Sequence, residues 1–265
     1  MYNLVSADLF KIRKSIAIKA AFAITSISAV FMSVIAYKIA NGSFQENMSG
    51  IGFLFGDTDI MSIFGGVLAG VYICSDFDNN IIHDAIAGGF SRIRIVTGKA
   101  VSFFCAAIFI LIPYAVVTSI ALGTGSKFSI GSMSMGFLNL LTSEAGSTLT
   151  AAGTGKMLIV VLTLIIVCAA QLSPCVFLAF VIKKPVIVVA VYYGFSIFFG
   201  QLAILAKGSK VFYDILSCTP FGGQYALLTL SSGAGDIIKA AAVSLVFIIA
   251  ILLLTHLVFR KMEIK

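Results

Sequence analysis

Long apolar runs separated by short polar segments dominate the chain. A helix needs about 20 apolar residues to cross the hydrocarbon core of a bilayer. Reading the apolar stretches between charged residues predicts six spans, at about residues 18–37, 60–76, 98–122, 157–182, 185–206 and 239–259. We therefore predict an all-α polytopic membrane protein in which residues 1–265 form a single transmembrane domain.

Two segments outside the spans have the period of an amphipathic helix. Before the first span, Val5, Leu9, Ile12 and Ile16 fall on one helical stripe, which predicts an interfacial helix over about residues 2–16. A disordered basic leader is the alternative. Between spans two and three, Ile81, Ile82, Ala85 and Ile86 share a face and Gly88 and Gly89 end the helix. Its apolar side needs a partner, which is the protein's own helices, lipid or a separate subunit. An ordinary connecting helix with solvated charges is the alternative.

The two longer links on the other side differ in character. Residues 123–155 are rich in Gly, Ser and Thr, which predicts little fixed structure beyond an apolar patch at residues 137–141. Residues 207–239 are amphipathic but interrupted by Pro220 and Gly222, so they predict short helices that dip into the outer leaflet.

Composition and charge add sidedness to this picture. The chain is 60% hydrophobic and 11% charged, with a mean hydropathy of +1.09, which excludes a soluble globule. The predicted loops on the side of the two termini hold twelve Lys and Arg against five acidic residues, whereas the other side holds six of each. The positive-inside rule makes the basic side cytoplasmic, so we expect a multi-pass cell-membrane protein with both termini in the cytoplasm. The positive charge then reflects topology and contact with anionic membrane lipid, and gives no reason to expect nucleic-acid binding.

Groups for catalysis or ion coupling are scarce. Lys19, Asp57, Asp59 and His256 fall near predicted span ends, where we expect snorkelling to satisfy them. The spacing of the cysteines and histidines favours neither a metal site nor a disulfide framework. A phosphate-binding loop is also missing, because Gly155-Lys156 is followed by Met157 where Ser or Thr is needed. We therefore expect no bound cofactor and no enzyme activity in this chain.

Taken together, these features resemble a type-2 (export-class) ABC transporter permease over nearly the whole chain. The most telling stretches are Asp76, the short helix from Ile81 to Ala87, the run from Gly88 to Arg92 and Lys99, which are similar to the family's coupling-helix region. Thr219-Pro220-Phe221-Gly222 resembles the family's re-entrant segment. Asn80 departs from the threonine that is common there.

The resemblance implies a subunit that exports an amphipathic or hydrophobic substrate, such as a peptide, a drug or a lipid-like molecule. It implies docking onto ATP-binding subunits, which bind the ATP, through Ile81, Ile82, Ala85, Ile86, Phe90 and Arg92. It also implies a second permease subunit, and Gly66 and Gly70 form a small-residue face suited either to that dimer or to packing within one subunit. An ion-coupled secondary carrier or channel is the alternative function, and a membrane enzyme is a more distant one.

Overall fold

The computed structural model describes residues 2–43, 56–130, 135–146, 151–205, 208, 210–222 and 224–262. These residues form helices and connecting turns, with no strand among them. The elements are α1 (Tyr2–Lys14), α2 (Ile16–Ala40), α4 (Asp57–Ala69), the π-helical turn η1 (Gly70–Cys74), α5 (Ser75–Asp78), α6 (Ile81–Ala87), α7 (Arg92–Gly123), α8 (Gly136–Ser143), α9 (Ala151–Ile182), α10 (Pro185–Leu205), α11 (Lys210–Leu216), the 3₁₀ turn η3 (Tyr225–Leu227) and α12 (Ala234–Lys261).

Within the described residues, six helices are long and apolar enough to cross a membrane. They are α2, the continuous helix formed by α4, η1 and α5, and then α7, α9, α10 and α12, and each overlaps one of the predicted spans. The protein is therefore an all-α polytopic membrane protein, as the apolar runs predict.

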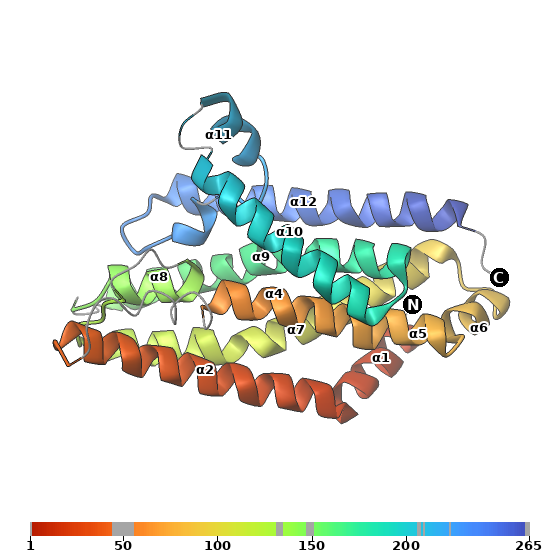
Figure 1. Ribbon diagram of the computed structural model, residues 1–265, viewed down its shortest axis with the longest axis horizontal. Coiled ribbons are helices and arrows are strands. Elements are labelled where there is room, and N and C mark those ends of the chain that lie inside the picture. Colours follow the sequence, from red (N-terminus) through yellow and green to blue (C-terminus); the bar gives the residue numbers. More distant parts are fainter. Residues whose placement is uncertain are drawn as a thin grey trace.

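The spanning helices run side by side along the length of the molecule (Figure 1). One end of this bundle carries α1, α5, α6 and the last turn of α12, and we call it the α6 end. The opposite end carries α8, with α11 projecting nearby, and we call it the α8 end. Because the six spanning helices are even in number, α1 and the last turn of α12 both lie at the α6 end (Figure 1).

The second span is the central helix of the bundle. In its most apolar window 72% of residues are buried inside the protein, compared with 11% for α10 and 17% for α12. Apolar side chains on the outer faces of α10 and α12 are therefore left for contact with lipid or another subunit.

Gly66 and Gly70 bring the second span against α10 of the same chain. A Cβ atom added at Gly66 would lie 2.8 Å from the backbone Cα of Val189, and one added at Gly70 would lie 2.9 Å from Cβ of Pro185. Of the two roles that the sequence left open for this small-residue face, the structure shows packing within the subunit. Gly70 also begins the π-helical turn, whose wider winding changes the face on which the following residues lie.

Local backbone conformation sets where the short helix α6 begins and ends. Asn80, just before α6, has a φ of +57°, a left-handed conformation that asparagine tolerates far better than the β-branched threonine expected there. Gly89 after α6 has a φ of +85°, so the glycine pair ends this helix as predicted.

At the α8 end the expectation of little fixed structure in residues 123–155 is incomplete. The apolar patch forms the helix α8, in which Phe137 and Leu140 are fully buried. Burial of these apolar side chains against the bundle offsets the conformational entropy cost of ordering α8.

Candidate functional site

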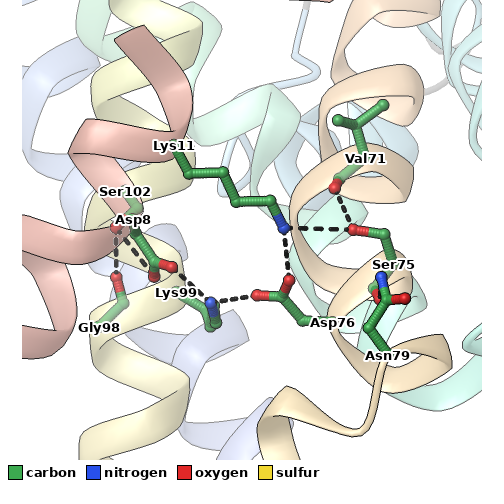
Figure 2. Close-up of polar contacts among 9 residues, drawn as sticks. All are labelled: Asp8, Lys11, Val71, Ser75, Asp76, Asn79, Gly98, Lys99 and Ser102. Carbon is green, nitrogen blue, oxygen red and sulfur yellow. Dashed lines mark hydrogen bonds and ion pairs between the residues drawn. The ribbon is translucent and has the colours of Figure 1, made fainter. Parts of the chain in front are cut away.

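Four charged side chains meet at the α6 end of the bundle. Lys99 Nζ on α7 lies 2.6 Å from Asp8 Oδ1 on α1 and also forms an ion pair with Asp76 Oδ2 on α5. Lys11 Nζ on α1 lies 2.5 Å from the other oxygen of Asp76. Figure 2 shows this chain of contacts, which we call the ion-pair cluster and define as Asp8, Lys11, Asp76 and Lys99.

Burial makes this cluster different from surface ion pairs. Asp76 is 1% exposed and Lys99 is 3% exposed, while Asp8 is also buried and Lys11 is partly open. Two cations and two anions balance, so the group carries no net charge into the interior. Removing any one partner leaves a buried charge without compensation, which destabilises proteins far more than losing an exposed pair.

Neutral groups complete the cluster. Ser102 Oγ donates to the carbonyl oxygen of Gly98 at 3.0 Å and approaches Asp8 Oδ2 at 3.4 Å, while Lys11 Nζ lies 3.4 Å from Ser75 Oγ (Figure 2). A Cβ atom added at Gly98 would lie 2.9 Å from Cδ2 of Leu4. The glycine therefore lets α1 lie directly on α7.

A second set of contacts ties α5 to the helices on its other side. Phe77 meets Phe180 of α9 edge to face, with ring centroids 5.7 Å apart, and Phe259 of α12 at 6.2 Å. The ammonium group of Lys183 lies 5.1 Å from the centroid of the Phe77 ring. Neighbouring residues of α5 thus link the second span to α1 and α7 through charge and to α9 and α12 through aromatic packing.

The structure divides the predicted coupling residues of α6 into two groups. Ile81 is 42% exposed, whereas Ile82 is 1% exposed and belongs to the protein's own core. Ala85, Ile86 and Phe90 are half-buried against that core. The predicted apolar face is therefore largely covered from within the chain, and among its residues Ile81 is the one most open to a partner.

Arg92 has a role inside the chain that the sequence did not indicate. Its guanidinium group donates to the carbonyl oxygens of Phe259 at 2.7 Å, Arg260 at 2.9 Å and Met262 at 2.8 Å. These carbonyls end α12 and lack partners within the helix, so a cation there is favourable. Arg92 thereby joins the start of α7, next to α6, to the end of the last span.

The ion-pair cluster itself was not predicted from the sequence, in which its members were counted among the loop charges and Asp76 and Lys99 were matched only to the family's coupling-helix region. A usable signal was present. Asp76 and Lys99 both fall inside predicted spans, and Asp8 and Lys11 are one helical turn apart beside the apolar Ile12. Opposite charges within apolar segments favour one another as partners.

Asp57 corrects a second expectation. We expected Asp57 to lie near a span end and to reach the aqueous interface by snorkelling. Lys19, which is exposed, fits that expectation. Asp57 is instead 1% exposed, because α8 folds against the start of α4 and its backbone N–H at Phe137 donates to Asp57 Oδ2 at 2.6 Å.

Other candidate chemistry is sparse in the described part of the chain. Cys74, Cys168 and Cys175 are buried as free thiols, and Cys105 and Cys218 are exposed free thiols. No group of three or more His, Cys, Asp or Glu residues suited to a metal ion occurs among the described residues. Within the bundle, Gln171 Nε2 on α9 donates to the carbonyl oxygen of Pro220 at 3.0 Å, which fixes the interrupted segment before α12 against α9.

Comparison of this chain with protein-family models and with curated proteins finds no match.

Proposed function

We propose that this chain is the membrane-spanning permease subunit of an ATP-driven ABC transporter that exports an amphipathic or hydrophobic substrate. The observation that carries the proposal is the ion-pair cluster beside α6. It supports the proposal because a transporter without its own nucleotide site needs a stiff connection from a docking element to its spanning helices. The cluster joins α1, α5 and α7 beside α6, and few residues separate α6 from either α5 or α7.

The mechanism follows from that connection. An ATP-binding subunit contacts the exposed side of α6 around Ile81, on the cytoplasmic side of the membrane. Movement of α6 is transmitted through Asp76 and Lys99 to α1 and α7 and through Phe77 to α9 and α12. A packed interface with two stable arrangements converts a small displacement at one site into rearrangement of whole helices.

The proposal includes a second permease subunit and surrounding lipid as partners. The outer faces of α10 and α12 support this, since they are apolar and little buried within the subunit. Gly66 and Gly70 are not part of that contact, because α10 of the same chain covers them.

An exposed-face substitution tests the docking step. We expect Ile81→Asp to abolish co-purification of the ATP-binding subunit from membranes without changing the amount of folded permease, because a charge is introduced on the exposed face alone. Val186→Asp is the matched control, since Val186 is exposed at the start of α10 and lies off α6. Undiminished co-purification with Ile81→Asp would remove α6 from the docking surface.

The second candidate function is an ion-coupled secondary carrier. The observation that favours it is the buried carboxylate of Asp57, because ion-coupled carriers place such groups within their helix bundles. The two functions separate on the source of energy. Transport that survives the loss of ATP but stops when the ion gradient is dissipated supports the carrier, and the reverse result supports the ABC permease.

A further inference from the structure

Asp57 is the first residue of α4, which begins toward the α8 end of the bundle, whereas α1 and α5 lie at the α6 end (Figure 1). Its two carboxylate oxygens have different surroundings. Oδ2 accepts the short hydrogen bond from the backbone N–H of Phe137, near the start of α8. Oδ1 is buried and has no hydrogen-bond partner in the described structure. An unpartnered oxygen on a 1% exposed carboxylate is costly unless something binds it.

Asp57 lines a small cavity between α2, α4, α7 and α8. The other polar side chains on its wall are Ser33, Tyr114 and Thr118, and the rest of the described wall is apolar. The space holds about one water molecule or one monatomic ion of similar size. Asp57 and three residues with hydroxyl groups therefore line a space of atomic size. The hydroxyls of Tyr114 and Ser33 also donate to Ser28 Oγ at 3.0 Å and to the carbonyl oxygen of Ala29 at 2.9 Å.

Charge balance selects what fits there. The described lining residues include no Lys, Arg or His that could neutralise Asp57. The hydrogen bond to the start of α8 favours the ionised carboxylate, since anions are stabilised at a helix N-terminus. A buried carboxylate is neutralised either by a proton or by one bound positive charge, and a divalent ion would leave an excess charge in a site with a single carboxylate.

We propose that Asp57 Oδ1, together with the hydroxyl oxygens of Ser33, Tyr114 and Thr118, binds a small monovalent metal cation of the size of sodium. The donor set consists of oxygen alone, which hard cations prefer over nitrogen and sulfur ligands. The bound ion bridges α2, α4, α7 and α8 and holds the α8 end of the bundle together. This site does not depend on the proposed transport function or on its source of energy.

Thermal unfolding of the purified full chain in lipid nanodiscs tests the site directly. Unfolding is measured in sodium chloride, potassium chloride and choline chloride at equal ionic strength. We expect the midpoint in saturating sodium to exceed that in choline by about 5 °C, because a ligand that binds only the folded state stabilises it. We expect Asp57→Asn to remove this sodium-dependent shift.

Two variants and a direct measurement keep the test decisive. Asp59→Asn lies in the same turn of α4 but off the cavity wall, so it should retain the full sodium shift. Thr118→Val removes one hydroxyl with little change in shape and should weaken sodium binding about tenfold. Titration of the wild-type and Thr118→Val chains with radioactive sodium measures this change even if Asp57→Asn fails to fold. Equal midpoints in sodium and choline, or a stability that responds to pH but not to sodium, would overturn the proposal.

Discussion

Lys99 shows most clearly how a single residue determines the architecture at the α6 end. It is a long cation near the start of a spanning helix, where an isolated ammonium group would be expelled toward water. The carboxylates of Asp8 and Asp76 instead hold it in the interior, and each comes from a different helix. A charged residue that is costly to bury therefore specifies how α1, α5 and α7 meet.

Replacing Lys99 with methionine should be strongly destabilising. The methionine fills a similar volume but leaves Asp8 and Asp76 in the interior without their shared cation, and we expect a loss of about 3–5 kcal/mol in the free energy of unfolding. Adding Asp76→Asn to the same chain should recover part of that loss. Lys19→Met is the control, because Lys19 is exposed. Denaturant unfolding in detergent gives the values, and similar losses for both lysines would show that the ion-pair cluster contributes nothing specific.

Gly136 provides a second test at the residue scale. It has a φ of +64°, and an added Cβ would lie 2.2 Å from Asp57 Oδ2. Gly125 has a similar φ of +66° with nothing within 4 Å of an added Cβ. We expect Gly125→Ala to lower the free energy of unfolding by about 1 kcal/mol and Gly136→Ala by a further ~1–3 kcal/mol. Equal losses would mean that Asp57 does not lie against the start of α8.

Among the secondary-structure elements, the sequence predicted which helices form better than it predicted which helices contact each other. Apolar runs and their period located the six spanning helices and α6, because burial in lipid or protein imposes those patterns directly. They did not show that Ile82 faces the protein's own core or that Arg92 holds the end of α12. Such contacts join residues distant in the chain, and no local pattern specifies which helices become neighbours.

The packing of α4 against α10 gives the prediction at this scale. We expect Gly66→Ala to lower stability by about 2 kcal/mol or more, because the new methyl group meets the backbone of Val189 at 2.8 Å and backbone cannot move aside easily. Gly194→Ala, on α10 with nothing within 4 Å, should be neutral or slightly stabilising. Thermal unfolding and size-exclusion chromatography distinguish the alternatives. A change in oligomeric state at unchanged stability would place Gly66 in a dimer contact instead.

For the whole molecule, the fold class was predictable from composition and length, but the polar interior was not. The spans were expected to be nearly free of buried charge, yet Asp57 is buried at one end of the bundle and Asp76 and Lys99 at the other. These residues lie close to span boundaries, where one turn of helix separates exposure to headgroups from burial among neighbouring helices. Only the packing of α1 and α8 onto the bundle decides between the two.

Site-specific photo-cross-linking tests whether a nucleotide-binding subunit docks onto this protein at α6. A photoreactive amino acid is placed at Ile81 in native membranes. The control position is Ile238, which is exposed near the start of α12, at the end of the bundle opposite α6. We predict that position 81 cross-links to an ATP-binding-cassette protein identified by mass spectrometry and that position 238 does not. Cross-links from position 81 that reach only lipid, the chain itself or a protein without a nucleotide site would contradict the account.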